Sequence, residues 1–194
     1  KDLDWNKSYT SASAKMPKYG QPHTFNLIDL KGYAYDHEAW GTLLDQLTLD
    51  EQIEMLGKAY HGTPAILSIV KPKETTSDAP NGVHSGGQSM HFPCAGLLAA
   101  SFNDELAEQV GEFIGEDMLH THTSGLYAPA ANIHRNAYGA RAYEYYSEDG
   151  FLSGIMAMRQ VKGIQSKGGY VNMKHLVGND QEINRYGIGI WANE

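Results

Sequence analysis

The sequence predicts an α/β fold in which helices connect the strands of a parallel sheet. Residues 124–130 (SGLYAPA) and 169–176 (GYVNMKHL) have the composition of short strands, and residues 151–166 between them have that of a helix. Strand, helix and strand in this order form the βαβ unit of a parallel sheet. A polar loop follows each predicted strand. In such folds, above all in the (β/α)8 barrel, these loops build the active site.

The first part of the chain is predicted to divide into an arm and the start of a folded domain. Residues 1–36 are rich in Ser, Lys, Pro, Gly and Tyr without sustained periodicity, which is typical of an arm or linker. Residues 37–194 are expected to form the α/β domain. Two helical pieces open this domain, and the second begins at Thr48 with Glu51 three positions on, the pattern of a capping box.

A buried strand, a loop and a long helix are predicted next. The apolar residues 65–70 (AILSIV) lie between two prolines and fit a first strand, whereas the polar residues 71–89 are expected to form a loop. Asn103 can cap a helix that extends to residue 120. The apolar residues of this helix recur at helical spacing and are expected to form core; they are Leu106, Val110, Phe113, Ile114 and Met118.

Composition excludes several classes of protein. A length of 194 residues with 41% hydrophobic content is normal for one globular domain. The net charge of -8 argues against a nucleic-acid partner, and no apolar run is long enough to cross a membrane, so neither partner is expected. Cys94 is the only cysteine, which excludes an intrachain disulfide and a thiolate zinc site; we expect it to be a small buried residue. No cofactor is expected.

Residues 132–149 (NIHRNAYGARAYEYYSED) indicate a functional loop, because they show neither helical nor strand periodicity. Together with the other predicted strand-end loops they offer acids and bases in comparable numbers, with several tyrosines. This mixture suits a neutral ligand covered in hydroxyls, whose apolar face can stack on a ring. A carbohydrate ligand is therefore predicted. Gly139 would let the backbone approach that ligand or adopt a positive φ.

Four segments resemble, in order, motifs of glycoside hydrolase family 3. The segment NIHRNAYGARAYEYYSED resembles the family pattern NIHRSPxxGRNFEYYSED, and TSDAPNG resembles its substrate loop SDGPxG. The segments FPCAGLLAASFNDELAEQVGEFIGED and VKGIQSKGGYVNMKHLVGNDQEINR resemble FPxxxxLAATWNxELAxxxGxxxGEE and VKGxQSKGxxxxxKHFxxNxQExNR. The resemblance covers the chain from Leu43 onward. Within the family, the chain resembles members of β-glucosidase type.

This resemblance implies a retaining β-glycosidase, most often a β-glucosidase, with a (β/α)8 TIM-type barrel and a further αβα domain. By motif match, Asp78 is implied to bind the outer hydroxyls of the terminal sugar, with Arg141 in the same subsite. Lys174 and His175 match the pair that donates to ring hydroxyls. An ionised aspartate and cationic donors would form charge-assisted hydrogen bonds, which are stronger than neutral ones.

The same residues are open to structural roles. Asp78 could cap a turn, Arg141 could pair with Glu144 or Glu148, and His175 could be a satisfied packing residue. Glu144 is expected to serve the scaffold of the loop more than the sugar. The sequence also departs from the family pattern: Ala79, His84 and Ala140 stand where the family has Gly, Arg and Gly. These departures concern the identity of the sugar.

No catalytic residue is expected within these 194 residues. Retaining hydrolysis needs two carboxyl groups about 5–5.5 Å apart. The resemblance places the nucleophilic aspartate in a later barrel segment, commonly within SDW, and the acidic glutamate in the second domain; no SDW occurs here. We therefore expect the first half of a barrel, with the remaining half-barrel and the αβα domain of the same enzyme as its partners. This chain alone should not hydrolyse an aryl β-glucoside.

Two rival functions remain for the sequence. One is a non-catalytic carbohydrate-binding or degenerate scaffold. The other is a metal-dependent hydrolase that uses His120, His122, His134 and His175, because the HTH segment resembles the paired ligands of some barrel metalloenzymes.

Overall fold

The computed structural model describes residues 16–78, 80–84, 88–137 and 139–191. Packing divides the chain into two compact units. The first unit comprises Lys1–Ala59 and Pro64–Lys73, and the second comprises Tyr60–Thr63 and Glu74–Glu194. The candidate site lies within the second unit. No helix in the described ranges is long and apolar enough to cross a membrane.

The first unit is a small helical body. It contains the 3-10 helix η1 (Leu27–Leu30), the helices α1 (Ala39–Asp45) and α2 (Leu49–Lys58), and the 3-10 helix η2 (Leu67–Ile69). Its core consists of Leu30, Ala39, Leu43, Leu47, Ile66 and Ile69. Leu30 belongs to the region interpreted as an arm, and it packs in the same core as α1. The boundary expected near residue 36 stays a prediction.

The capping box of α2 is confirmed. The Thr48 hydroxyl accepts a hydrogen bond from the Glu51 backbone N–H at 3.2 Å, and the Glu51 carboxylate accepts one from the Thr48 backbone N–H at 2.9 Å. These reciprocal bonds satisfy two of the N–H groups that have no partner within the helix.

The prediction of a buried strand at residues 65–70 is wrong. Ile66 and Lys71 exchange two backbone hydrogen bonds of 3.0 and 2.9 Å, which close a tight turn around η2. Val70 completes the turn with a φ of 52°. The apolar residues Ile66 and Ile69 are buried because they belong to the core of the first unit, so their apolar character has a cause other than a sheet.

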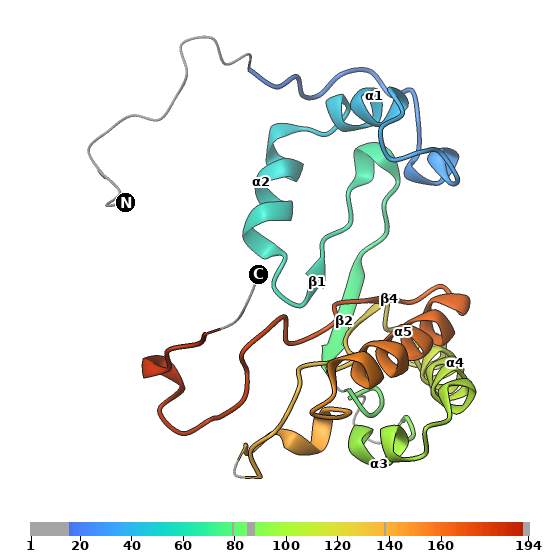
Figure 1. Cartoon of the computed structure of the whole chain (residues 1–194). Coiled ribbons are helices and arrows are strands. Elements are labelled where there is room, and N and C mark those ends of the chain that lie inside the picture. The colour runs from blue at the N-terminus through green and yellow to red at the C-terminus, as the bar shows by residue number, and fades with distance from the viewer. Residues whose placement is uncertain (1–15, 79, 85–87, 138, 192–194) are drawn as a thin grey trace. The chain divides into compact units, whose positions relative to one another are not determined.

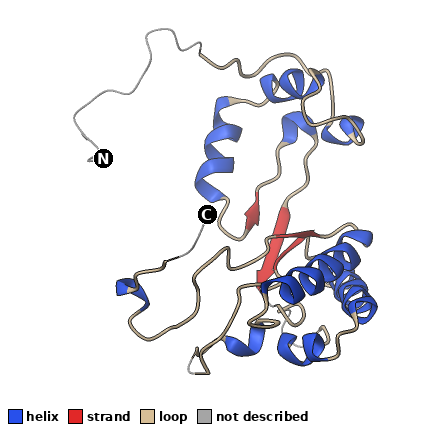
Figure 2. Ribbon diagram, in the orientation of Figure 1, coloured by secondary structure: helices blue, strands red, loops and turns tan. Residues whose placement is uncertain are grey.

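A mixed sheet of four strands organises the second unit (Figure 2). Its strands, in spatial order, are β1 (Gly62–Thr63), β2 (Glu74–Asp78), β3 (Gly125–Tyr127) and β4 (Tyr170–Val171). β1 pairs antiparallel with β2, whereas β2, β3 and β4 run parallel. The expected βαβ unit is therefore present at β3 and β4, and Asp78 lies opposite Tyr127 at the carboxyl end of β2.

The first parallel strand, β2, lies within the segment predicted to be a loop. Its sequence is ETTSD, and none of its residues is fully buried. A strand without apolar alternation gives no period-2 signal, which explains why the sequence pattern did not reveal it.

In the described part of the second unit, the α-helices are α3 (Ala95–Ala100), α4 (Asp104–His120) and α5 (Gly150–Ser166). The side chains of Asn103 and Asp149 cap α4 and α5 by accepting the backbone N–H groups of the third helical residues, at 2.9 and 2.8 Å. Ile114 and Met118 of α4 and Ile164 of α5 pack on Leu126 and Ala128 of the β3 region. The two long helices, which lie side by side in Figure 1, thus cover the same sheet.

The buried face of α4 differs in part from the predicted one. Ile114 and Met118 are buried as expected, but Leu106 and Phe113 are 39% and 53% exposed. They line an apolar groove with Phe92, Pro93, Leu97, Leu98 and Val110. The prediction that Leu106 and Phe113 belong to the core is therefore wrong.

Small residues explain why the buried face of α4 differs from the predicted one. Its contact with α5 is made by Ala107, Gly111 and Gly115 together with Gly163, which let the two backbones approach closely. Cys94 is also exposed, contrary to expectation, because Ala95 and Ala99 occupy the buried positions of α3.

Candidate functional site

Asp78 and Lys174 meet at the carboxyl end of the parallel sheet. Asp78 is the last residue of β2, and Lys174 follows β4 and forms an isolated bridge with Ala130. The Lys174 Nζ atom lies 2.7 Å from the Asp78 Oδ1 atom. The Asp78 side chain is 58% exposed, whereas the Lys174 side chain is 14% exposed. The carboxylate can therefore accept further hydrogen bonds from a ligand, while the cation is held mostly inside the protein.

A buried carboxylate, that of Glu144, also contacts Lys174. Glu144 ends the 3-10 helix η3 (Ala142–Glu144) and is only 1% exposed. Its Oε2 atom lies 3.4 Å from Lys174 Nζ, and its Oε1 atom accepts the Nε–H of Arg141. Asp78, Lys174, Glu144 and Arg141 thus form a chain of alternating charges. The hydrogen bond to Glu144 raises the pKa of Arg141 although burial opposes that shift, so the guanidinium stays charged.

His175 joins the cluster through neutral partners. The Tyr145 hydroxyl lies 2.7 Å from Nδ1 of His175, and the Asn179 amide nitrogen donates to the same hydroxyl and lies 3.3 Å from Nδ1. Because Tyr145 accepts from Asn179, its own proton is free to go to Nδ1. This arrangement assigns the neutral tautomer with its proton on Nε2, so Nε2–H is the donor that His175 can offer to a ligand.

The electrostatic surroundings favour this neutral form. Burial lowers the pKa of His175, and the positive charges of Arg141 and Lys174 lower it further, against the opposing influence of Glu144 and Asp78. Burial likewise raises the pKa of Tyr145, so its hydroxyl remains protonated and able to donate. The site therefore combines the cations Arg141 and Lys174, the exposed carboxylate of Asp78, the buried carboxylate of Glu144 and the neutral imidazole of His175.

Removal of the Tyr145 hydroxyl should release His175 from this tautomer. We expect Tyr145→Phe to shift His175 toward the tautomer with its proton on Nδ1, because Nδ1 loses its main donor. Tyr143→Phe is the matched control, since Tyr143 lies in the same loop and is 61% exposed. The ring 15N chemical shifts of His175 in both variants test this, and a tautomer unchanged by Tyr145→Phe would contradict it.

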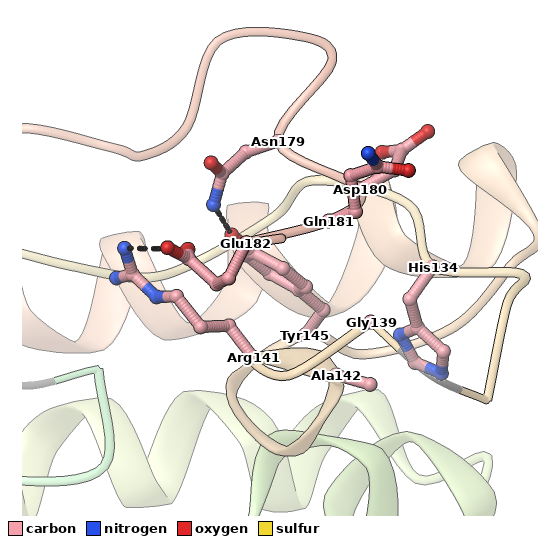
Figure 3. Close-up of a pocket in the computed structure, with 9 residues that line it drawn as sticks. All are labelled: His134, Gly139, Arg141, Ala142, Tyr145, Asn179, Asp180, Gln181 and Glu182. Atoms are coloured by element: carbon pink, nitrogen blue, oxygen red, sulfur yellow. Dashed lines mark hydrogen bonds and ion pairs between the residues drawn. The ribbon is translucent and has the colours of Figure 1, made fainter. Parts of the chain in front are cut away.

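Residues 179–182 close one side of the cluster (Figure 3). The Asn132 side chain holds this segment, because its Oδ1 accepts the Asn179 backbone N–H at 3.0 Å and its Nδ2 donates to Asp180 Oδ1 at 2.8 Å. Figure 3 shows the Glu182 carboxylate facing Arg141, with 3.8 Å between Oε1 and Nη1. A small cavity remains between this segment, the Arg141 loop and His134.

Gly139 permits the close approach of this segment. A Cβ atom at Gly139 would lie 2.8 Å from the Asp180 carbonyl oxygen. The backbone that comes close is a segment of the same chain, which the sequence pattern did not indicate.

The structure brings the four candidate residues into one network. Asp78, Arg141 and Lys174 are linked through Glu144, and His175 is attached through Tyr145, the neighbour of Glu144. The ion pair between Arg141 and Glu144, which the sequence offered as a structural alternative, is present. The sequence did not single out Asn132 and Asn179, although both lie within the quoted motifs.

The histidines of the metal alternative have other positions. His120 ends α4, His122 lies in the following turn with a φ of 54°, and His175 contacts Tyr145 and Asn179. Across the described ranges, no group of three or more His, Cys, Asp or Glu side chains is arranged to hold a metal ion.

These features define the class as α/β, with parallel strands joined by helices and a polar cluster at the carboxyl ends of the strands. The model of the glycosyl hydrolase family 3 N-terminal domain matches residues 42–186, and the chain belongs to this family. The fold-class prediction is confirmed: the second unit contains the strands and helices of part of a (β/α)8 barrel domain.

Curated relatives agree with this membership. The chain is 38% identical over 150 residues to a β-glucosidase of Rhizobium radiobacter, and 36% identical over 151 residues to a probable β-glucosidase I of Neosartorya fischeri. These matches cover 74% and 75% of this chain but only 18% of each relative. The chain thus spans less than a fifth of the length of these relatives.

Solved structures give the same result. β-Glucosidase 3B from Thermotoga neapolitana in complex with α-D-glucose matches with a TM-score of 0.66 and 35% identity, over 75% of this chain and 24% of its own. A β-glucosidase from Streptomyces venezuelae in complex with D-glucose matches with a TM-score of 0.70 and 31% identity, over 78% of this chain and 20% of its own.

Proposed function

We propose that this chain supplies the terminal-sugar subsite of a retaining β-glycosidase of β-glucosidase type. In this proposal the exposed Asp78 carboxylate accepts hydrogen bonds from two outer hydroxyls of a terminal glucose. Lys174, Arg141 and the Nε2–H of His175 donate to the remaining ring hydroxyls. The membership in glycosyl hydrolase family 3 and the glucose complexes of two similar structures support this choice of substrate.

The contrast between Asp78 and Lys174 is the observation that carries the proposal. A salt bridge that only stabilised the fold would have no need of a carboxylate that is 58% exposed beside a cation that is 14% exposed. A carboxylate that is 58% exposed next to charged donors can instead accept hydrogen bonds from vicinal hydroxyls, while the cations donate to them, because each hydroxyl both donates and accepts. The strand-end position is the one that (β/α)8 enzymes use for substrate.

Hydrolysis itself needs groups beyond this cluster. A retaining enzyme uses two carboxyl groups about 5–5.5 Å apart, one as nucleophile and one as acid and base. In the proposal, the nucleophilic aspartate and the acidic glutamate come from the remaining half-barrel and the αβα domain of the same enzyme. The match to only about a fifth of each relative supports such partners.

The test is the activity and sugar binding of the full-length protein. It should hydrolyse an aryl β-glucoside, leave the aryl α-glucoside intact, and release glucose first as the β-anomer, which NMR can follow. Asp78→Ala should abolish turnover and weaken glucose binding about 100-fold in calorimetry, because two charge-assisted hydrogen bonds are lost. Asp45→Ala, which removes only a 4.0 Å contact with Lys18 in the first unit, is the control.

Two outcomes would contradict the proposal in different ways. Glucose binding that depends on Asp78 without any turnover would indicate a non-catalytic carbohydrate-binding scaffold. Glucose binding that is the same in wild type and Asp78→Ala would remove Asp78 from the sugar subsite altogether.

A further inference from the structure

We infer that Glu144 is a positioning residue that sets the places of Lys174 and Arg141 in the sugar subsite without touching the sugar. This inference rests on the proposed function, and it goes beyond it by assigning the control of two sugar-binding cations to one buried carboxylate. Glu144 is 1% exposed, so no ligand can reach it, yet each of its oxygens faces a different cation.

The geometry explains why a single buried acid is needed here. Lys174 Nζ lies 2.7 Å from Asp78 and 3.4 Å from Glu144, so it is shared between an exposed and a buried carboxylate. A lysine that is shared in this way cannot turn fully onto Asp78. Part of the negative charge of Asp78 therefore remains available to sugar hydroxyls.

Arg141 is oriented by the same carboxylate. Its Nε–H donates to Glu144 Oε1, which fixes the plane of the guanidinium, and its Nη1 faces Glu182 at 3.8 Å. Because the guanidinium is planar, a bond at Nε determines where the outer nitrogens point. Without the buried charge, two neighbouring cations would repel each other, and Lys174 would turn toward Asp78, the other carboxylate with which it pairs.

A predicted binding defect follows from this arrangement. Glu144→Gln keeps the size of the side chain, but its amide nitrogen must face one of the two cations and cannot pair with it. Lys174 should then cover Asp78, and glucose should bind about 10-fold more weakly or worse, as measured by its inhibition of aryl β-glucoside hydrolysis by the full-length protein.

Glu148→Gln is the matched control, because Glu148 lies in the same loop but pairs at 3.6 Å with the exposed Arg135 and is itself 63% exposed. It should bind glucose within about 2-fold of wild type.

Double substitution separates positioning from general stability. In the Lys174→Met background, Glu144→Gln should weaken glucose binding by a clearly smaller factor than in wild type, because the lysine that it positions is gone. A purely structural role predicts the same factor in both backgrounds, and that result would overturn the inference. If Glu144→Gln does not fold, Glu144→Asp takes its place: its shorter side chain keeps the charge but cannot reach both cations.

The controls also distinguish the two proposals. If Asp78→Ala abolishes glucose binding while Glu144→Gln or Glu144→Asp binds glucose as wild type does, the positioning role is wrong and the proposed sugar subsite stands. If Asp78→Ala also binds glucose normally, both are wrong.

Discussion

Replacement of Gly163 by alanine should strongly destabilise the second unit. A Cβ atom at Gly163 would lie 2.1 Å from the Glu108 carbonyl oxygen and 2.7 Å from the Glu112 backbone nitrogen. Both atoms belong to the backbone of α4, so the clash can only be relieved by moving the two helices apart. We expect a loss of about 3 kcal/mol in the free energy of unfolding, the upper end of typical overpacking costs.

Gly154→Ala is the control for this substitution. Gly154 lies in the same helix, and a Cβ atom there would meet no atom within 4 Å. Because alanine is the better helix former, this variant should be more stable by up to about 1 kcal/mol. Thermal unfolding of the full-length protein should therefore move in opposite directions for the two variants. A melting temperature for Gly163→Ala at or above that of wild type would show that the helices are not in direct backbone contact.

Lys174→Met should cause the largest loss of activity among changes to the cations of the site. The substitution removes the donor between Asp78 and Glu144 and leaves the buried Glu144 with Arg141 as its remaining close cation. We expect kcat/KM for an aryl β-glucoside to fall about 100-fold or more, the effect of losing a hydrogen bond to charged groups.

Lys162→Met provides the comparison for this variant. Lys162 is 63% exposed and pairs at 2.6 Å with Glu108, on the helices rather than at the strand ends. Because exposed ion pairs contribute little, its kcat/KM should stay within about 2-fold of wild type. Equal activity of the Lys174 and Lys162 variants would exclude Lys174 from the proposed subsite.

Features that depend on neighbouring residues could be predicted from the sequence. Asn103 at the start of α4 and the Thr48–Glu51 pair at the start of α2 are as expected, because a cap needs only residues three positions apart. The helix at Gly150–Ser166 and the parallel strands on either side of it also followed from local patterns.

Features that depend on distant segments were missed or misassigned. Residues 65–70 are apolar because they fill the core of the first unit, while the strand β2 carries no buried residue and lies in a polar segment. Leu106 and Phe113 have helical spacing but are exposed, because the glycine contact between α4 and α5 turns another face of α4 inward.

The sequence by itself determined the family, the helix caps and the strand–helix–strand unit formed by β3, α5 and β4. Only the tertiary structure decided which carboxylate faces the solvent and which is buried. Asp78 and Glu144 are both acids in quoted motifs, but the first is 58% exposed and the second has 2% of its side chain exposed. Burial is set by contacts between segments far apart in the chain, here that of Lys174 with Glu144, and a local pattern contains no record of that contact.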